Sequence, residues 1–433
     1  MIARRRVLTG GAAASAALAL GACSGSGGGG ADPTDKKANS GKKVTLWIMQ
    51  GTNAKADAYI DALKKAFTDK TGATLDVQVQ PWDGAHDKFV TAMSGGTGPD
   101  VAEVGASWTA EFADAGGLDD LTEDMKKAGV ADGWVKGLLD YAVVDKKTYG
   151  VPWYAGVRSI VASKKALDAA KVNAQPKDWS ELLTMITALK KAKPDMIPFP
   201  VAGAAPLSMM SYLWGAGGEI ATESGGKWKS SIADPKVVEG LTWYTDLALK
   251  HGASSAAANT WKETDSLKAF QQGKVAMFTT GSWVPATIKA AAPDLYDDLV
   301  AFTVPGKDKP VAPAVLGGSH LCRFTESKEP ELAFALIQLM ATGDFATRWA
   351  KETAFFPGEQ KALDEVVKSG DELTKVFAKQ MTEGGKALPV TPAWGKIEGK
   401  KTLPTMLSSV LGGTAPQAAA SKAASEMDQI FGA

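Results

Sequence analysis

The 433-residue chain has very little cysteine and histidine and no net charge. Its only cysteines are Cys23 and Cys322, and no disulfide is possible if Cys23 carries a lipid, as argued below. The 48 basic residues balance the 48 acidic ones, so no overall field attracts nucleic acid or an anionic membrane surface. We therefore expect a fold stabilised by packing, an uncharged partner and no nucleic-acid contact.

Motifs of the common catalytic sites are also missing. The chain contains no G-x-S-x-G, no G-x-x-x-x-G-K-[ST] and no H-E-x-x-H. Its three histidines, His86, His251 and His320, are too far apart in the sequence to suggest a metal site. We expect no metal, no cofactor and no enzymatic activity. Acidic residues are abundant, so a glycoside hydrolase with paired carboxylates stays open as an alternative.

The N-terminus has the composition of an export signal. The charged triplet Arg4–Arg6 precedes the apolar run Val7–Leu20, which is too short to span a bilayer. Two small residues directly before Cys23 match a lipobox, in which the cysteine sulfur receives a diacylglycerol. We expect a lipoprotein signal peptide over 1–23, lipid on Cys23 and a flexible tether over 24–43. The arginines leave both Sec and twin-arginine export open.

The remaining roughly 390 residues are enough for two domains. Past residue 43 no apolar run is long enough for a transmembrane helix. The protein is therefore expected on the outer face of the cytoplasmic membrane, held there by its lipid alone.

Hydrophobic periodicity predicts a β-α-β-α-β series near the start of the body. Strands are expected at 44–49, 75–79 and 99–104, with a helix before Gly72 and another around Phe89. This alternation predicts α/β architecture with a parallel or mixed sheet.

A second α/β series begins near residue 149. It is expected to contain strands at 159–163 and 273–278 and helices that begin after Asp178 and Asp234. Late strands at 299–304 and 314–322 indicate that the chain crosses back to the first lobe and returns. We assign 44–152 plus about 286–318 to the N-terminal lobe, and 153–285 plus about 319–433 to the C-terminal lobe.

Tryptophan is unusually frequent, with 13 copies against 7 tyrosines. Trp47, Trp179 and Trp243 lie in a predicted strand or amphipathic helices, where core packing explains them. Five others lie in loop contexts beside Gly, Pro or polar residues: Trp82, Trp108, Trp153, Trp283 and Trp394. For these five, a binding role is at least as good an explanation as packing.

The physical chemistry of these residues favours a carbohydrate ligand. The apolar C–H face of a pyranose stacks on an indole, and aromatic contacts contribute about 0.5–1.5 kcal/mol beyond burial. The hydroxyl rim of the sugar needs hydrogen-bond donors and acceptors. Asp83, Glu103 and Arg158 lie near the aromatic positions in the sequence and supply such groups.

Six motifs occur in a characteristic order along the chain. They are Gly98-Pro-Asp-Val101, Tyr149-Gly-Val-Pro-Trp153, Asp178-Trp-x-Glu-Leu182, Phe270-x-x-Gly-Lys-Val-Ala-Met277 with Gly281-Ser-Trp283, Gly317-Gly-Ser319 and Pro404-Thr-Met-Leu407. In this order, and behind a lipobox, the chain resembles extracellular sugar-binding proteins of ABC importers, the family that includes maltose-binding protein. The segment Thr391-Pro-Ala-Trp394 makes it most similar to the chitobiose-type and other oligosaccharide binders of Gram-positive bacteria.

This resemblance implies the two-lobed periplasmic-binding-protein fold of type II, with mixed sheets flanked by helices and hinge strands that cross between the lobes. It places Trp153, Trp283 and Trp394 among the family's stacking aromatics and Gly317–Ser319 at a hinge crossing near the ligand. The complete set of expected ligand-binding residues is Trp82, Asp83, Glu103, Trp108, Trp153, Tyr154, Arg158, Trp283, Gly318, Ser319 and Trp394. His320 departs from the Asn or Ala common after the Gly-Gly-Ser motif, so no role is transferred to it.

The resemblance further implies a monomeric receptor that captures a di- or oligosaccharide, with the N,N'-diacetylchitobiose or N-acetylglucosamine type as the candidate, and delivers it to a permease pair driven by a cytoplasmic ATPase. Two other classes stay open: a lipid-anchored glycoside hydrolase, and a surface sensor or adhesin of the same fold.

Overall fold

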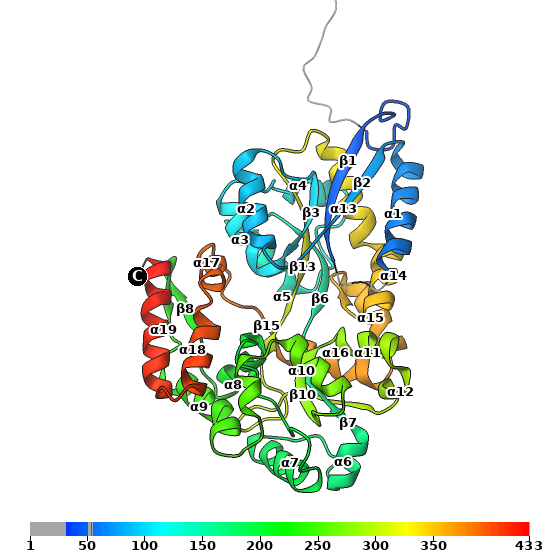
Figure 1. Ribbon diagram of the computed structural model, residues 1–433. Coiled ribbons are helices and arrows are strands. Elements are labelled where there is room, and N and C mark those ends of the chain that lie inside the picture. The colour runs from blue at the N-terminus through cyan, green and yellow to red at the C-terminus, as the bar shows by residue number, and fades with distance from the viewer. Residues whose placement is uncertain (1–31, 51–52, 54, 433) are drawn as a thin grey trace, which may run out of the picture.

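The computed structural model describes residues 32–50, 53 and 55–432, which form two α/β lobes (Figure 1). The expected signal peptide over 1–23, its Cys23 and the tether as far as residue 31 lie outside the described residues. Among the residues described, no helix combines the length and the apolar character needed to cross a membrane.

The first lobe is built on a six-stranded mixed sheet. In spatial order its strands are β14 (Phe356–Pro357), β6 (Val151–Gly156), β13 (Gly317–Arg323), β3 (Val101–Gly105), β1 (Lys43–Met49) and β2 (Thr74–Gln80). β1 pairs in parallel with β2 and β3, whereas β13 runs antiparallel to both β3 and β6. The predicted β-α-β-α-β series is confirmed as the parallel part of this sheet.

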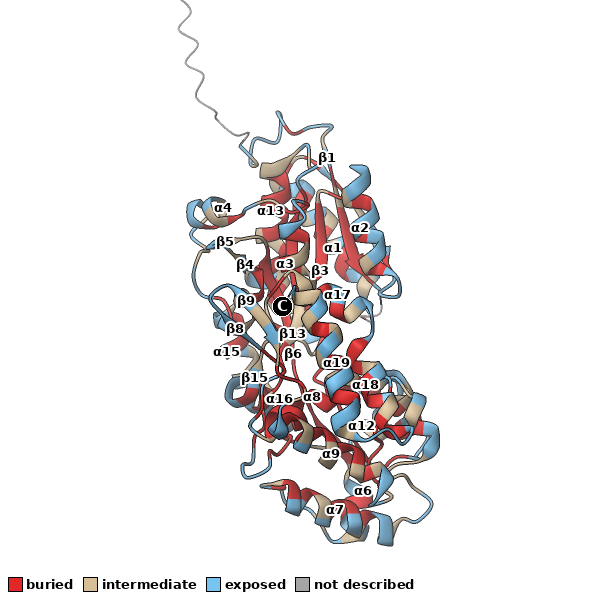
Figure 2. Cartoon of the chain, turned by 90° about the vertical axis from the view of Figure 1, so that its left-hand side faces the viewer, coloured by how far each residue is buried: buried red, intermediate tan, exposed pale blue. Residues whose placement is uncertain are grey.

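Helices cover both faces of this sheet. Successive residues of a strand point to opposite faces, so each strand contributes side chains to both helix layers. Leu46 and Ile48 of β1 pack toward α1 (Ala56–Thr71), α13 (Pro330–Ala341) and α14 (Gly343–Thr353). Trp47 and Met49 pack instead toward α2 (Ala85–Gly95) and α3 (Ala106–Asp114). Figure 2 shows the strands buried between helices whose outer faces are exposed. Small elements complete the lobe: α4 (Thr122–Lys127), α5 (Lys136–Leu139), a 3-10 turn (Asp140–Ala142) and the hairpin β4 (Val143–Val144) and β5 (Lys147–Thr148).

The second lobe has a three-stranded antiparallel sheet in the order β10 (Met277–Gly281), β7 (Arg158–Ser163) and β11 (Leu299–Phe302). Around it lie α6 (Lys164–Ala170), α7 (Trp179–Ala192), α8 (Pro206–Gly215), α9 (Pro235–Leu249), α10 (Glu263–Gln271), α11 (Val284–Ala291), α12 (Pro293–Tyr296), α15 (Gln360–Ser369) and α16 (Glu372–Gly384). The chain ends with α17 (Ala393–Gly399), α18 (Thr402–Leu411) and α19 (Pro416–Phe431), on one side of this lobe (Figure 1). The short strands are β8 (Ala221–Ser224), β9 (Lys227–Ser230), β12 (Ala314–Val315) and β15 (Gly385–Lys386).

Several local sequence signals have the expected structural outcome. Gly72 ends α1 in the left-handed conformation, with φ of 79°. Asp178 caps α7 by accepting a hydrogen bond from the backbone N–H of Glu181 at 2.8 Å. Pro235 is the first residue of α9. The stacked rings of Trp179 and Trp243, 4.5 Å apart, confirm their predicted role in packing.

The expected division of the chain between the lobes needs correction. β11, at residues 299–302, pairs with β7 and belongs to the second lobe, whereas β13 pairs with β3 and β6 in the first. By sheet membership, the first lobe therefore contains the strands within 43–156 and 317–357, and the second lobe contains the strands β7, β10 and β11 within 158–302. Hydrophobic periodicity identified the late strands but could not identify their partners, because pairing is decided by contacts distant in sequence.

The expectation of a flexible tether over 24–43 is wrong for residues 32–42. Residues 32–42 form turns on the first lobe, in which Asn39 is fully buried and donates to the backbone carbonyls of Asp32 and Pro33 at 3.2 Å. Lys42 forms an ion pair with Glu329 at 2.8 Å. A polar, lysine-rich composition suggested a linker, but these polar groups find partners in the lobe.

A buried histidine joins β13 to the helices beneath it. His320 is fully buried; its Nε2 lies 2.9 Å from the Leu138 carbonyl oxygen and its Nδ1 lies 2.7 Å from Thr109 Oγ1. The carbonyl requires a donor, so Nε2 carries the proton and Nδ1 accepts from the threonine hydroxyl. Burial lowers the pKa of His320 to about 4.

We predict that His320 contributes a loss of stability as the pH falls from 6.5 to 4. In that window the unfolded imidazole binds a proton that the folded one does not, so the free energy of unfolding decreases, by up to about 3 kcal/mol. Urea unfolding at several pH values should show a smaller loss for His320→Gln, whose amide does not titrate. Parallel pH profiles for the two proteins would contradict this role of His320.

Candidate functional site

A cavity of about 780 Å³ lies between the two lobes. Its first-lobe wall comes from the end of β1, the loop after β2, the start of α3 and the strands β6 and β13. The second lobe contributes the start of β7, the start of α8, the start of α10, and α17 with α18. The cavity therefore lies where the strands cross between the lobes.

Eight of the eleven expected ligand-binding residues line this cavity. They are Trp82, Trp108, Tyr154, Arg158, Trp283, Gly318, Ser319 and Trp394. The structure brings them together from positions spread over more than 300 residues of sequence.

Four indoles lie around the cavity, two from each lobe. Trp82, which is 39% exposed, meets Trp108 edge to face at 5.9 Å between ring centroids. Trp283 stacks on Phe355, with centroids 4.8 Å apart and planes 15° apart. Trp394, on α17, is buried and forms part of the cavity lining.

Two glycines leave room for the ring of Trp283. A Cβ at Gly281 would lie 2.2 Å from Trp283 Cη2, and one at Gly156 would lie 2.9 Å from Cζ3. The indole ring thus lies directly against the backbone of Gly156 and Gly281. This close approach explains why the Gly281-Ser-Trp283 motif begins with a glycine.

Gly318 is required for a different reason. It has φ of 153°, just before the register shift between Ser319 and His320 where β13 pairs with β6, and a Cβ there would come within 2.1 Å of the Tyr154 carbonyl oxygen. The register shift sets the place of Ser319 in the cavity wall.

An ion pair forms part of the second-lobe wall. Arg158 Nε lies 2.6 Å from Glu263 Oε1 and its Nη2 lies 3.2 Å from Oε2, a two-pronged contact. The guanidinium carbon also lies 5.6 Å from the centroid of Trp283. The charge of Arg158 is therefore compensated within the wall, although both side chains contribute polar atoms to the cavity.

Three expected ligand-binding residues do not line the cavity. Trp153 is 1% exposed and packs on Trp349 of α14 at 4.3 Å, because the alternation of β6 turns it away from the face that presents Tyr154. Asp83 is exposed outside the cavity lining. Glu103 is fully buried behind it.

Glu103 instead supports the wall from within. Its Oε1 accepts hydrogen bonds from the hydroxyls of Tyr154 and of Ser319, the latter at 3.0 Å, and its Oε2 accepts from the Met49 backbone N–H at 2.8 Å. These contacts join β1, β3, β6 and β13 at one point. Burial raises the pKa of Glu103 to about 7 despite these donors.

Sequence reasoning missed several cavity residues, among them Gln50, Glu263, Phe355 and Glu398. Glu398 follows Trp394 by four residues on α17, and its Oε1 accepts from the indole Nε1 at 3.0 Å. That i,i+4 spacing was the one available signal for it. Phe355 stands next to Phe356, and the sequence does not say which of the two faces the cavity.

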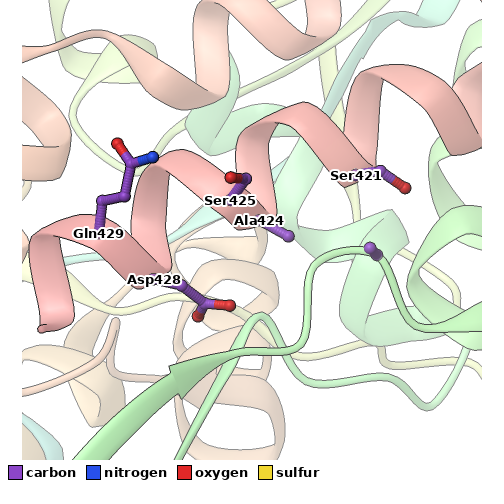
Figure 3. Close-up of a pocket in the computed structure, with 6 residues that line it drawn as sticks. Ser421, Ala424, Ser425, Asp428 and Gln429 are labelled. Atoms are coloured by element: carbon purple, nitrogen blue, oxygen red, sulfur yellow. The ribbon is translucent and has the colours of Figure 1, made fainter. Parts of the chain in front are cut away.

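A second hollow lies on the outer face of the second lobe, along α19 (Figure 3). Ala233, Ser421, Ala424, Ser425, Asp428 and Gln429 line it. It contains no aromatic ring, and Asp428 Oδ1 already accepts from the Ser230 backbone N–H at 2.7 Å. Within the described ranges, no group of three or more His, Cys, Asp or Glu side chains is placed to hold a metal ion.

Residues 51–344 match the profile of a family described as bacterial extracellular solute-binding protein. The chain is also 30% identical over 408 residues to the diacetylchitobiose binding protein DasA of Streptomyces coelicolor, a match that covers 92% of this chain and 93% of DasA. The chain belongs to the bacterial extracellular solute-binding protein family. Members of this family are non-enzymatic transport receptors.

Solved structures of other solute-binding proteins share the fold. An ABC transporter solute-binding protein from Thermotoga lettingae, bound with α-D-tagatose, has a TM-score of 0.79 at 28% identity over 90% of this chain and 100% of that one. The GacH receptor of Streptomyces glaucescens has a TM-score of 0.78 at 22% identity, over 90% of this chain and 99% of that one. The expected family and the two-lobed α/β fold of periplasmic binding proteins are thereby confirmed.

We predict that Glu103 makes stability fall as the pH rises from 4.5 to 7. In that window the folded carboxyl holds a proton that the unfolded one has lost, so the free energy of unfolding decreases as the pH rises, by up to about 3 kcal/mol. Urea unfolding from pH 4.5 to 8 should give a flatter profile for Glu103→Gln, even if that variant is less stable throughout. An unchanged slope would show that Glu103 does not titrate there.

Proposed function

We propose that this chain is the carbohydrate-binding receptor of an ABC importer. The observation that carries the proposal is the interlobe cavity, where four indoles and a stacked Phe355 surround a paired Arg158 and Glu263. Indole faces bind the apolar face of a sugar ring, and the polar pair can exchange hydrogen bonds with its hydroxyls. A volume of about 780 Å³ is in the usual range for small-molecule sites.

The charges of the wall disfavour an anionic ligand. Arg158 is the one cation among the residues that line the cavity, and it is paired with Glu263. The Glu398 carboxylate accepts hydrogen bonds from Trp394, Trp108 and Ser107, none of which carries a charge. An anionic ligand would therefore find no unpaired cation in the described lining.

The ligand class that we propose is a di- or oligosaccharide of N-acetylglucosamine type. The support is the likeness to DasA, whose name describes it as a diacetylchitobiose binding protein, over 92% of this chain. The eight predicted residues that line the cavity are proposed to contact the sugar. Trp82 and Trp108 would face it from the first lobe, and Trp283 and Trp394 from the second.

In the proposed cycle, the sugar bridges the lobes and stabilises their closed arrangement by contacts available only there. The lobes would rotate as rigid bodies about the crossings at Val157 and Leu316. The closed, loaded receptor would dock on a permease pair with its ATPase. Lipid on Cys23 would keep the receptor beside them and raise its effective concentration.

We predict that the body from residue 32 onward gives a large thermal shift with one saccharide, which is recovered intact. The panel contains chitobiose, N-acetylglucosamine, trehalose, maltose, cellobiose, xylobiose and an amino-acid control. A ligand that binds only the folded state stabilises it by an amount that grows with the logarithm of its concentration. Chromatography of the recovered sugar checks for cleavage. No shift with any sugar contradicts the carbohydrate proposal, and cleavage products contradict the receptor proposal.

We predict that Trp283→Ala weakens binding of that saccharide at least about tenfold, which is about 1.4 kcal/mol. The substitution removes the indole ring, which stacks on Phe355 and lies near the Arg158 guanidinium in the cavity wall. Isothermal calorimetry measures the affinity, and Trp228→Ala, which removes an indole outside the cavity, is the matched control. Circular dichroism verifies folding. Unchanged affinity in folded Trp283→Ala would remove this ring from the site.

A further inference from the structure

Helix α17 touches both lobes. It packs on α18 and α19 of the second lobe and on α3 of the first. The approach to α3 is close: a Cβ at Gly395 would lie 1.7 Å from Glu111 Oε2, so a residue larger than glycine does not fit there. Figure 1 shows α17 reaching from the second lobe toward the first, beside α3.

One carboxylate at the end of α17 collects three donors. Glu398 Oε1 accepts from Trp394 Nε1 at 3.0 Å, within the same helix. Its Oε2 accepts from Trp108 Nε1 and from Ser107 Oγ, both at 3.1 Å and both on α3. All four side chains line the cavity. Two of the three hydrogen bonds therefore cross from one lobe to the other.

We propose that Glu398 is an interlobe latch, which holds α17 against α3 and fixes the edges of two indoles in the closed cleft. The role of this latch in transport rests on the proposed function. When the lobes separate, the bond to Trp394 can persist because it lies within α17. The bonds to Trp108 and Ser107 must break. Glu398 thus favours the closed arrangement without touching the ligand.

A latch has a different signature from a ligand contact. It raises the fraction of protein that is closed before binding, and the apparent affinity of each ligand that needs the closed form scales with that fraction. Loss of the latch therefore weakens all ligands by the same factor. A residue that contacts the sugar would affect ligands unequally.

The chemistry of the site makes Glu398→Gln a sharp test. An indole N–H can only donate, so each of the two tryptophans needs an acceptor. A glutamine offers one oxygen and one NH₂ group, and the NH₂ group must face either Trp394 or the pair on α3. An amide of nearly identical shape therefore cannot satisfy both sides.

The first measurement needs no ligand. Spin labels on Asp87→Cys of α2 and Ser425→Cys of α19, both exposed, report the distance between the lobes, while the buried Cys322 stays unlabelled. We expect a population with a short distance in the ligand-free protein that decreases in Glu398→Gln. The control Glu365→Gln removes the same charge from an exposed position on α15 and should match the unmodified protein. Equal distance distributions for Glu398→Gln and the control would overturn the latch.

The second measurement uses the saccharides that bind the unmodified protein. We expect Glu398→Gln to raise every dissociation constant by one common factor, on the order of tenfold. Ser107→Ala, which removes one interlobe donor and is expected to fold normally, should give a smaller change in the same direction. Losses that differ between sugars would make Glu398 a ligand contact and overturn the proposal. If no sugar binds the unmodified protein, the proposed function fails, while the ligand-free distances still decide on the latch.

Discussion

The two lobes depend on two points where a strand of the first lobe's sheet meets, end to end, a strand of the second lobe: β7 of its three-stranded sheet at one point, and β12, which pairs with β15, at the other. Val157 alone separates β6 from β7, and Leu316 alone separates β12 from β13. Each crossing leaves one strand in each lobe, with no loop to absorb a misfit. The residues on either side of the crossings, Tyr154, Arg158 and Ser319, are therefore placed by sheet pairing, which makes the cavity between the lobes a consequence of the topology.

Around the crossings the structure uses its acidic groups to hold other side chains. Glu103 binds two hydroxyls and a backbone N–H from inside the first lobe, Glu263 binds Arg158, and Glu398 binds two indoles. Each of these carboxylates accepts more than one hydrogen bond, so it fixes the positions of the side chains around it. A wall with fixed side chains loses little conformational entropy when a ligand binds.

Sequence reasoning succeeded where the determining contacts were local. The β1–α1–β2–α2–β3 series, the glycine that ends α1, the Asp178 cap of α7 and the proline that begins α9 follow from residues a few positions apart. It failed where partners were distant. The pattern of residues 299–302 predicts a strand but cannot say that the strand pairs with β7. The role of Glu398 depends on Ser107 and Trp108, about 290 residues away.

The same distinction explains the outcome for the site. Trp153 and its neighbour Tyr154 were both expected in the site, and of the two only Tyr154 lines the cavity, because Trp153 is taken up by packing on Trp349. Of the five tryptophans that loop context singled out, the other four line the cavity, and sequence context alone could not separate Trp153 from them.

Gly281 and Gly156 have no unusual backbone angles, so ordinary rules for glycine give no reason to keep them. Their constraint comes from Trp283, whose ring occupies the space where their side chains would be. The three positions therefore form one sterically coupled unit. A side chain at either glycine fits only if the indole ring moves or is replaced by a smaller group, so the width of this part of the cavity wall is set by the three positions together.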